Sequence, residues 1–576
     1  MLKLKDITVR ATSAPDSAVL LDRVNVSYQL GHLGAIVGPS GCGKSTLLKT
    51  IAGLWEPGEG EIWWRGRNVD ADEDFYPSEL GYVPQFSIFH GRLTVREVVT
   101  TATRLRTRRG DRGVPVSQWV DDILSQVGLD EIGDRRTEVL SGGQMRRLGL
   151  ALEMVTRPSL LLCDEVTSGL DPHSEDEVVG LIRSLARDQQ RLVLSVTHSL
   201  RHLHYYDSVT VLKAGRLVFL GPPDHLLPFF RVNSAEDVFP ALEDVSLEEW
   251  QERFGLYEPY EQSVMNSVQT LEIESSEVEE PEMGAKSMGV MREPNALVQA
   301  GVLMGRRLRL FIRDPAQIGL QAALVLIFPL MVALFAYQGL PEIRNMSMTA
   351  DQNVLEDLKD RLQYTIQTSR VGGLVSGLVM FQVVLLTLMG ANNAAREIAN
   401  ERHIIEKEKL SGVRSSSILA SKLVYLVPLV LVQACWMAVF VKWVGDIPGD
   451  AMMQWWMLIG VTGAMTATSL AISAWAANSE QASLISIYLV GFQLPLSGTV
   501  LALPDFIAPL VRPFIAAYWS WSGYLQGLSD SRFYDMVTQI THTPVAEFFP
   551  SCLMLSVHVL TGIFLTWLGL TRSQWK

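Results

Sequence analysis

Residues 38–45 read Gly-Pro-Ser-Gly-Cys-Gly-Lys-Ser, and residues 140–144 read Leu-Ser-Gly-Gly-Gln. The first stretch has the spacing of a phosphate-binding loop, in which glycines let backbone N–H groups wrap nucleotide phosphates. Lys44 would add a positive charge beside the β and γ phosphates, and the Ser45 hydroxyl would bind Mg²⁺. The residues expected to hold ATP are Gly38, Pro39, Ser40, Gly41, Cys42, Gly43, Lys44, Ser45 and Thr46.

An acidic pair follows an apolar run further along the chain. Leu160–Cys163 is typical of a buried parallel strand, and it ends in Asp164 and Glu165. In phosphoryl transfer, carboxylates at such a strand end hold Mg²⁺ and orient the attacking water, so we assign the metal to Asp164 and catalysis to Glu165. Each motif alone could be a tight turn or a solvated strand end. Their occurrence together and in order predicts an ATP-hydrolysing domain.

These motifs resemble those of the ATP-binding-cassette (ABC) ATPase family. The resemblance implies that Gln85, after another predicted strand, contacts Mg²⁺ and water, and that His198, after Leu192–Val196, senses the γ-phosphate. Ser168–Asp171 is similar to the family's D-loop. The family's aromatic residue for stacking on adenine has no counterpart in Val9–Ser17.

The family's ATP sites are shared between two chains. The resemblance therefore implies that the phosphate loop of one copy is completed in another copy by Ser141, Gly142, Gly143 and Gln144.

Composition indicates a membrane protein. The 576 residues are 48% hydrophobic and only 19% charged, and the net charge of −13 argues against a nucleic-acid partner. The four cysteines have neither disulfide nor metal-ligand spacing. No signal peptide precedes Met1, so we expect the first domain to stay in the cytoplasm.

The predicted organisation has four parts. An α/β P-loop ATPase domain covers 1–245, and an acidic linker covers 246–295. A basic amphipathic helix at the membrane surface covers 296–315, and an all-α six-helix transmembrane domain covers 316–576.

A bilayer core of about 30 Å needs about 20 apolar residues in a helix. Six segments qualify, at about 316–338, 371–393, 417–441, 455–477, 481–503 and 551–570. Basic residues crowd the connection between the second and third segments, which places that connection and both termini in the cytoplasm. We interpret 504–528, which prolines interrupt, as a re-entrant or interfacial segment on the outer side, with its Trp and Tyr residues, among them Trp521, at the level of the lipid headgroups.

This order of domains resembles a half-transporter of the G subfamily of ABC proteins, with an ABC2-type membrane domain. Arg313-Asp314-Pro315, Arg396–Arg402 and Leu494–Gly498 carry the resemblance. Asp164-Glu165-Val166-Thr167, with Val where the family often has Pro, and the lack of paired outer cysteines favour a bacterial relative in the cell membrane. The resemblance implies a dimer, either of two copies or with another half-transporter; the intact motifs favour two copies.

The resemblance also implies sites in the membrane domain. Glu401 and Arg402 would couple ATP hydrolysis to the spans, although the charges around them could serve only to orient the chain. Thr499 and Val500 would form an apolar gate. The expected substrate-cavity residues are Gln382, Asn392, Asn393, Val490, Gln493 and Leu494. Asn392 and Asn393 could equally make contacts at a helix end on the cytoplasmic side.

Such a cavity favours an amphipathic, lipid-like or drug-like solute. The expected function is ATP-driven export of that solute across the membrane with ATP and Mg²⁺. The alternative is a non-transporting membrane ABC ATPase that regulates or remodels a membrane partner.

Overall fold

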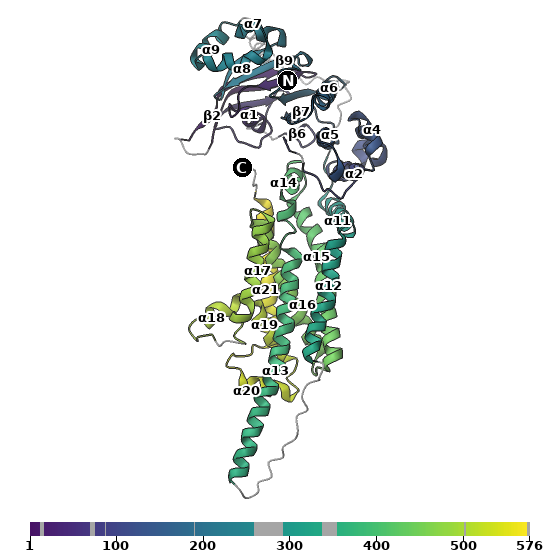
Figure 1. Cartoon of the computed structure of the whole chain (residues 1–576), viewed down its shortest axis with the longest axis vertical. Coiled ribbons are helices and arrows are strands. Elements are labelled where there is room, and N and C mark those ends of the chain that lie inside the picture. Colours follow the sequence, from purple (N-terminus) through teal and green to yellow (C-terminus); the bar gives the residue numbers. More distant parts are fainter. Residues whose placement is uncertain are drawn as a thin grey trace, which may run out of the picture. The chain divides into compact units, whose positions relative to one another are not determined.

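The computed structural model describes residues 1–11, 17–69, 75–86, 88–188, 191–257, 292–336, 354–499 and 503–572. The chain divides into two compact units, each described by itself (Figure 1). The N-terminal unit consists mainly of Met1–Asn295, with Leu410–Val413. The helical unit consists mainly of Ala296–Lys409 and Arg414–Gln574.

The larger sheet of the N-terminal unit has six strands in the order β10-β9-β3-β8-β7-β6. The strands are β3 (Leu33–Val37), β6 (Leu80–Val83), β7 (Leu160–Asp164), β8 (Leu192–Val196), β9 (Ser208–Lys213) and β10 (Arg216–Gly221). All neighbours are parallel except β9 and β10. Every residue of β3, β7 and β8 is buried, as in a parallel sheet covered on both faces. The predicted α/β P-loop fold is confirmed.

A second, antiparallel sheet packs into the same unit, in the order β2-β1-β4-β5. Its strands are β1 (Leu2–Arg10), β2 (Val19–Tyr28), β4 (Glu59–Trp64) and β5 (Arg67–Asn68). Both sheets contribute apolar side chains to one core, where Trp64 and Ile36 are buried. The start of β2 therefore lies close to the loop that follows β3.

The helices of this unit surround the larger sheet. They are α1 (Lys44–Ile51), α2 (Val95–Arg106), α3 (Arg109–Arg112), α4 (Val116–Gln126), α5 (Gly142–Met154), α6 (Pro172–Asp188), α7 (Leu226–Phe230), α8 (Val238–Asp244) and α9 (Leu247–Gly255). Two of them begin at capping boxes, formed by Thr94 with Glu97 and by Ser141 with Gln144. The sequence thus fixes where α2 and α5 start.

The predicted boundary at residue 245 falls just before an ordered helix. The Ser246 hydroxyl accepts a hydrogen bond from the Glu249 backbone N–H (3.2 Å) and caps α9. Trp250 is 1% exposed and stacks on Phe229. The segment predicted as a linker therefore begins with a helix of the N-terminal unit, and residues 258–291 of that segment lie outside the described residues.

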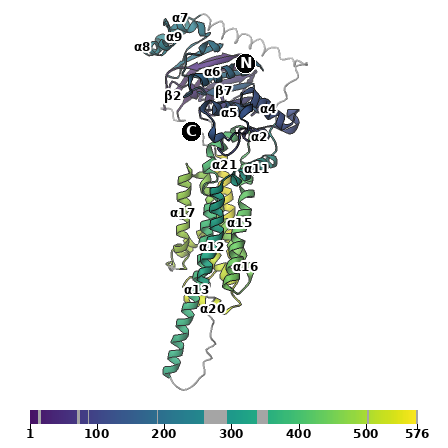
Figure 2. The same ribbon diagram turned by 45° about the vertical axis from the view of Figure 1, so that its right-hand side comes forward.

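The helical unit contains long helices that run side by side (Figures 1 and 2). Its α-helices are α11 (Ala296–Ile312), α12 (Pro315–Ala336), α13 (Val354–Ala394), α14 (Arg402–Leu410), α15 (Ser415–Gly445), α16 (Ala451–Trp475), α17 (Ser479–Leu496), α18 (Ala508–Val511), α19 (Ala516–Gln526), α20 (Arg532–Ile540) and α21 (Phe548–Thr571). The predicted interfacial helix at 296–315 corresponds to α11. Asp314 accepts a hydrogen bond from the Gln317 N–H (3.0 Å), and Pro315 opens α12.

Five helical stretches of the described residues are long and apolar enough to cross a membrane. They are Pro315–Ala336, Tyr364–Leu410, Ser415–Gly445, Ala451–Trp475 and Phe548–Thr571. The segment predicted as the fifth span corresponds to α17, which is not among them. Its first turn is polar (Ser479, Glu480, Gln481) and it carries Gln493 near its end, and these residues lower its hydropathy. The number of six spans stays a prediction.

The predicted outer segment at 504–528 contains two short helices. Residues 500–502 lie outside the described residues, α18 follows them, and α19 packs against α16 and α21. Trp521 on α19 is fully buried and donates a hydrogen bond to the Ser376 hydroxyl (3.2 Å). This aromatic residue is therefore part of the protein core, whereas we had expected it at the level of the lipid headgroups.

The stretch between the first two predicted spans is also partly helical, because α13 already begins at Val354. Residues 337–353 lie outside the described residues.

Candidate functional site

The predicted phosphate loop connects β3 to α1 and depends on glycine. Gly38, Gly41 and Gly43 have φ angles of 151°, 77° and 104°, which side chains rarely tolerate. A Cβ atom at Gly38 would lie 2.3 Å from the Leu212 carbonyl oxygen, and one at Gly43 would lie 2.7 Å from the Leu20 carbonyl oxygen. A Cβ atom at Gly41 would meet nothing within 4 Å. The loop is thus held tightly at both ends and is open in the middle.

Lys44 begins α1, and its side chain folds back into this loop. The Nζ atom donates hydrogen bonds to the carbonyl oxygens of Gly38 (2.9 Å) and Pro39 (2.8 Å), and the residue is 5% exposed. The N-terminus of a helix attracts anions because its first N–H groups have no partner within the helix. The charge of Lys44 and the start of α1 therefore favour a phosphate at the same place.

Ser45, at the start of α1, and Asp164, at the end of β7, are in contact at one edge of the larger sheet. The Ser45 hydroxyl donates to Asp164 Oδ1 (2.8 Å), and the Tyr82 hydroxyl donates to Asp164 Oδ2 (3.1 Å). Burial raises the pKa of the Asp164 carboxyl, whereas these two hydrogen bonds act in the opposite direction. Burial and the charge of Asp164 also raise the pKa of the Tyr82 hydroxyl, which keeps it protonated as a donor.

Glu165 contacts Gln85 and His198, the two residues that the family resemblance assigns to Mg²⁺ and water and to the γ-phosphate. Gln85 Nε2 donates to Glu165 Oε2 (2.6 Å), and His198 Nε2 lies 2.7 Å from Glu165 Oε1. Glu165 also has a φ angle of 49°, an uncommon conformation for a residue other than glycine. Backbone strain of this kind is concentrated at functional sites, because only a well-supported surrounding structure can maintain it.

The order of the strands explains why these residues converge. Parallel strands end at one edge of the sheet, and ligands of such sheets bind there. The phosphate loop follows β3, Gln85 follows β6, Asp164 ends β7 and His198 follows β8. The neighbours β3-β8-β7-β6 thus bring segments distant in the sequence to one edge.

The residues at this edge fit a nucleotide with Mg²⁺. The open loop around Gly41 and the Lys44 ammonium match phosphate oxygens, and a hydroxyl beside a carboxylate provides the oxygen ligands that Mg²⁺ prefers. Ser45, Asp164 and Gln85 are the candidate ligands.

Ser141, Gly142, Gly143 and Gln144 lie at the start of α5. The Ser141 hydroxyl and the Gln144 side chain bond each other's backbone N–H groups, at 3.3 and 3.0 Å. Ser141 and Gly142 are exposed. Arg146, on the next turn, donates to the Ser168 carbonyl oxygen (3.4 Å). The first residues of this segment are therefore accessible to solvent. Arg146 connects α5 to Ser168–Asp171.

Sequence reasoning missed Tyr82 as a site residue. Its hydroxyl contacts Asp164 because β6 pairs with β7 in a register that sets Val83 opposite Cys163. The signal was a Tyr at the penultimate position of the strand that lies beside the acidic strand. The position of Tyr82 identifies it as a site residue only once β6 and β7 are known to be neighbouring strands.

In the helical unit, the predicted cavity residues divide into two groups. Gln382, Asn393, Val490 and Gln493 are buried, whereas Asn392 and Leu494 are exposed. Gln493 accepts a hydrogen bond from the Ala517 N–H (3.1 Å). Of the predicted gate, Thr499 lies 2.8 Å from the Ser497 hydroxyl, and Val500 lies outside the described residues.

Asn393 belongs to a buried amide triad that joins three helices. Asn393 Nδ2 donates to Gln433 Oε1 (2.7 Å), and Gln433 Nε2 donates to Gln321 Oε1 and Asn393 Oδ1 (both 3.0 Å). The three amides come from α12, α13 and α15. Within membranes such amides connect helices by hydrogen bonds. A separate cavity of about 520 Å³ lies between α15, α16 and α21, and its apolar lining includes none of the predicted cavity residues.

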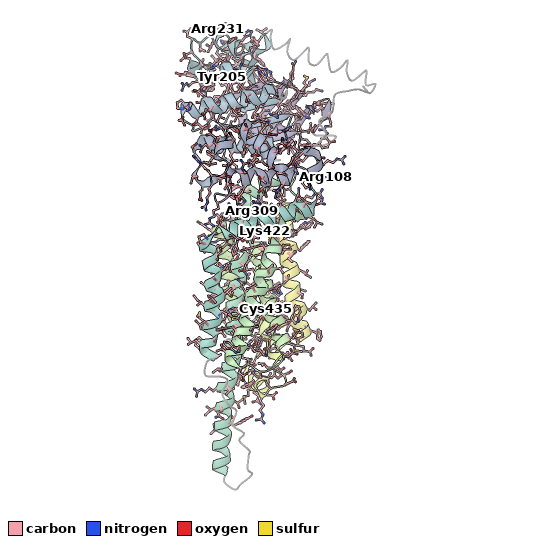
Figure 3. All side chains as sticks on the ribbon, turned by 90° about the vertical axis from the view of Figure 1, so that its right-hand side faces the viewer. Arg108, Tyr205, Arg231, Arg309, Lys422 and Cys435 are labelled. Carbon is pink, nitrogen blue, oxygen red and sulfur yellow. The ribbon has the colours of Figure 1, made fainter. Side chains whose placement is uncertain are left out.

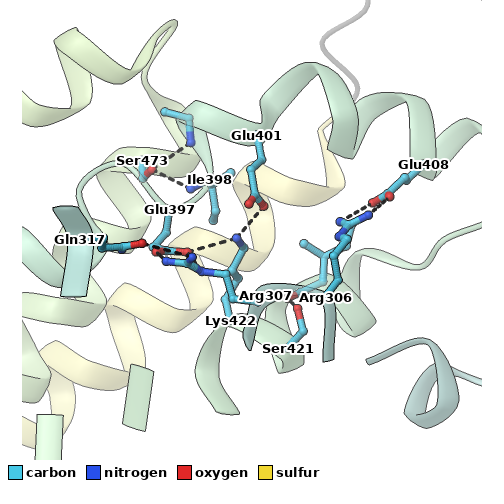
Figure 4. Close-up of polar contacts among 12 residues, drawn as sticks. Arg306, Arg307, Gln317, Glu397, Ile398, Glu401, Glu408, Ser421, Lys422 and Ser473 are labelled. Atoms are coloured by element: carbon cyan, nitrogen blue, oxygen red, sulfur yellow. Dashed lines mark hydrogen bonds and ion pairs between the residues drawn. The ribbon is translucent and has the colours of Figure 1, made fainter. Parts of the chain in front are cut away.

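The predicted coupling residues take part in contacts at one end of the helical unit. Lys422 Nζ donates to Glu401 (2.7 Å) and to Glu397 (3.1 Å), and Arg307 also binds Glu397 (Figure 4). Arg402 donates to the Ala474 carbonyl oxygen (2.8 Å) at the end of α16. Lys422 lies near the start of α15, and Cys435 lies further along that helix (Figure 3).

A second charge pair links α11 to α14, because the two terminal guanidinium nitrogens of Arg306, Nη1 and Nη2, donate to the two carboxylate oxygens of Glu408. The short stretch that precedes α14 is also fixed. The Ser473 hydroxyl accepts hydrogen bonds from the backbone N–H groups of Ile398 and Ala399, both at 3.0 Å. Helix α14 and this stretch are thus tied to α11, α15 and α16.

Comparison with known proteins agrees with both units. The family model for ABC transporters matches residues 21–168, and that for ABC-2 type transporters matches residues 298–528. The ABC transporter ATP-binding/permease protein Rv1747 of Mycobacterium tuberculosis is 40% identical over 230 residues, which are 39% of this chain and 26% of that protein. The methionine import ATP-binding protein MetN 1 of Rhodococcus jostii is 32% identical over 39% of this chain and 68% of its own length.

The broad substrate specificity ATP-binding cassette transporter ABCG2 of Rattus norvegicus is 31% identical over 34% of this chain and 31% of its own length. The chain thus spans about a quarter of the mycobacterial relative and about a third of the rat one. Together with these matches, the fold and the site define an ABC-type ATPase joined to a multi-pass membrane domain. The chain belongs to the ABC transporter family, with the domain order of a G-type half-transporter.

Proposed function

We propose that this chain is one half of a dimeric ABC transporter that exports an amphipathic, lipid-like or drug-like solute. One observation carries the proposal: Lys44, Ser45, Gln85, Asp164, Glu165 and His198 converge at one sheet edge of a chain that also contains membrane-spanning helices. An ATPase site and a membrane domain in one polypeptide support work done on a solute in the bilayer.

The roles of the site residues follow from their chemistry. Lys44 and the N–H groups of the glycine loop would bind the β and γ phosphates, while Ser45, Asp164 and Gln85 would hold Mg²⁺. Bound Mg²⁺ supplies positive charge beside the phosphate oxygens. Glu165 would orient the attacking water, but both of its oxygens already have partners in Gln85 and His198. Each carboxylate oxygen has a second lone pair, so Glu165 can accept a hydrogen bond from that water while it keeps both contacts.

We infer a dimer because the helix start at Ser141 and Gly142 is exposed to solvent. A helix N-terminus with glycines at its tip is suited to receive the γ-phosphate held by a second copy. Two ATP molecules would then lie between two chains. Closure of this dimer on ATP and its opening after hydrolysis would drive the cycle.

The segment Ala399–Leu410 is our candidate for transmitting that motion. Lys422 joins Glu397 and Glu401, so a shift of the segment carrying Glu401 must move α15 or break buried charge contacts. The ATPase domain and both termini would face the cytoplasm, where the basic residues of this connection are retained.

We place the substrate on the two-fold axis of the dimer. Asn392 and Leu494 are exposed in a single chain and are the best candidates to line a cavity shared by two copies. Gln382, Asn393, Val490 and Gln493 would form its supporting layer. Thr499 and Val500 remain the proposed gate.

Vectorial transport tests this proposal directly. Purified chain in proteoliposomes should move a fluorescent lipid or amphipathic dye in one direction when ATP is added on the side of the ATPase domain. The Lys44→Ala variant is the control. ATP hydrolysis without flux of any tested solute would favour the alternative function, an ATPase that regulates or remodels a membrane partner.

A further inference from the structure

The cavity between α15, α16 and α21 is elongated and apolar. Its volume is about 520 Å³, and the described residues that line it include no charged side chain. Each helix contributes one face, so that on α21 the lining positions recur every three or four residues: Cys552, Leu555, Ser556, Val559, Leu560 and Ile563. At 1.5 Å per residue, this face lines the cavity over about 17 Å. The shape and the lining thus fit a long apolar molecule.

The two hydroxyl groups of the lining are already used within their own helices. Thr466 Oγ1 donates to the Thr462 carbonyl oxygen, and Ser556 Oγ donates to the Cys552 carbonyl oxygen, both at 2.8 Å. Neither hydroxyl therefore has a hydrogen left to donate to a ligand. A buried water needs two to four polar partners, and apolar cavities without them stay dry. An occupant held by hydrocarbon contacts fits this cavity better than water does.

The rim of the cavity is exposed on helices that can cross a membrane. Val427, Leu431, Trp456 and Leu560 line it and are between 42% and 66% exposed. They belong to α15, α16 and α21, each of which is long and apolar enough to span the bilayer. Apolar side chains exposed on such helices face the hydrocarbon of the lipids. The cavity therefore opens toward the bilayer interior, and a hydrocarbon chain can enter it without passing through water.

Two glycines of α16 determine how much space lies beside α21. A Cβ atom at Gly460 would lie 2.9 Å from Leu555 Cδ1, so the two helices touch there. A Cβ atom at Gly463 would meet only Val559 Cγ2, at 3.7 Å, which is ordinary contact. Both glycines line the cavity. A larger side chain at position 463 could therefore occupy the cavity without displacing the backbone.

We propose that this cavity binds one hydrocarbon chain of a bilayer lipid. The headgroup stays outside, because the described lining has no charge to hold it. The volume lies within the range of roughly 300–1,000 Å³ that is usual for small-molecule sites. The bound chain restores the packing contacts that an empty cavity lacks, and it thereby joins α15 to α16 and α21. This inference concerns the helical unit alone and does not depend on the proposed transport.

The test uses a phospholipid that carries a photoactivatable diazirine in its acyl chain. The full-length protein is labelled in liposomes, and the labelled peptides are mapped by mass spectrometry. Labelling of 423–431 and 552–563 should exceed that of the exposed α12 residues Leu326, Ile327 and Leu330, which report ordinary contact with lipid.

Two variants fill the cavity from different helices. Gly463→Leu on α16 and Ser556→Phe on α21 should each lower the labelling of the cavity about tenfold, since small changes of volume in an apolar pocket change binding by that much. Labelling of α12 should not change, which shows that the variants are folded in the bilayer. Gly319→Leu is the matched control, because a Cβ atom at this exposed glycine of α12 would meet nothing within 4 Å.

Three results would overturn the inference. The cavity could be labelled no more than α12 in the wild type, which would indicate ordinary lipid contact only. Undiminished labelling in both filled variants would place the probe elsewhere. Displacement of the probe by the fluorescent amphipathic dye of the transport assay would assign the cavity to the transported solute instead of a resident lipid.

Discussion

Glu165 combines two features that seldom occur together: a left-handed backbone conformation and a carboxylate with a partner on each oxygen. Gln85 holds one carboxylate oxygen and His198 contacts the other. Its position is therefore set by the residues around it, which come from β6 and β8, as well as by its own strand.

The first prediction concerns this carboxylate. Glu165→Gln should lower ATP turnover by about 10²–10⁴-fold, because the amide does not orient and deprotonate water as a carboxylate does. ATP binding should persist, since Glu165 adds no attraction for phosphate. Phosphate release and equilibrium binding of a labelled nucleotide measure the two effects. Asp134→Asn, at a side chain that is 96% exposed, serves as the control. Undiminished turnover in the Gln variant would remove Glu165 from the catalytic role.

The second prediction concerns Tyr82, which sequence reasoning did not find. Tyr82→Phe removes the donor to Asp164 Oδ2 and leaves the ring in place. Residues that orient a metal ligand typically contribute 10–100-fold to metal affinity. We expect the Mg²⁺ concentration for half-maximal turnover to rise about tenfold, with little change in maximal rate at saturating Mg²⁺. An unchanged Mg²⁺ titration would contradict this role.

The contrast between Lys44 and Tyr82 shows what sequence can predict at this scale. The phosphate loop is a local structure, so its residue spacing alone identifies Lys44 and Ser45. Tyr82 instead acquires its contact from β7, because Asp164 lies 82 residues further along the sequence. The role of Tyr82 depends on the strand order, which spacing does not encode.

At the scale of elements, the contacts of Glu401 connect α14 and its preceding turn to α15. Lys422 is 5% exposed and lies between Glu401 and Glu397. Breaking a buried charge pair leaves one charge unpaired, which costs roughly 3–5 kcal/mol. The segment and α15 are therefore expected to move together.

The third prediction follows. Glu401→Arg places like charges together and should lower substrate flux per ATP hydrolysed about tenfold, in the range of typical coupling free energies. Glu401→Gln, which keeps an acceptor for Lys422, should have a smaller effect. The ratio of flux to hydrolysis in the same liposomes measures both. Glu480→Arg, at an exposed position on α17, is the charge-matched control. If Glu401→Arg and Glu480→Arg give the same ratio, the charges serve only to orient the chain.

Element boundaries were harder to predict than element types. Apolar runs predicted helices where α12, α15, α16 and α21 lie, because length and hydropathy suffice for such helices. The charged residues of α9 predict a linker, although Trp250 anchors this helix in the core. The sequence predicts Trp521 as an interfacial residue, since its sequence neighbours do not reveal that α16 and α21 enclose it.

At the scale of the whole molecule, one chain carries both the phosphate loop and the segment Ser141–Gln144. Under our proposal these two parts of the chain contribute to two different ATP sites of the dimer. The fourth prediction uses this arrangement. Lys44→Ala damages the phosphate loop, and Ser141→Arg damages the segment offered to a partner. Each variant alone should be inactive, and their co-expression should restore hydrolysis at one of the two sites in the mixed dimer. Tagging the two variants differently allows the mixed dimer to be purified and its turnover measured. Full hydrolysis by an isolated monomer would contradict a shared site.

The close packing of α16 against α21 has a consequence for how the chain is threaded. Gly460 of α16 lies against Leu555, and on α21 Gly562 lies against Ala467 and Gly569 against Ala474. Residue numbers increase together along the two helices, so both point the same way. If both helices cross the bilayer in the same direction, the chain that connects them must itself cross the bilayer an odd number of times.

Among the described residues between them, α17 has 18 residues and α19 and α20 have 11 and 9. Only α17, about 27 Å long, approaches the ~30 Å of the bilayer core. Single cysteines at Glu480 and Phe506, on either side of α17, should therefore react with an impermeant maleimide from opposite faces of the membrane. Reaction of both from one face would show that α17 does not cross. The parallel direction of α16 and α21 thus predicts that α17 crosses the membrane, although its hydropathy is too low to identify it as a span.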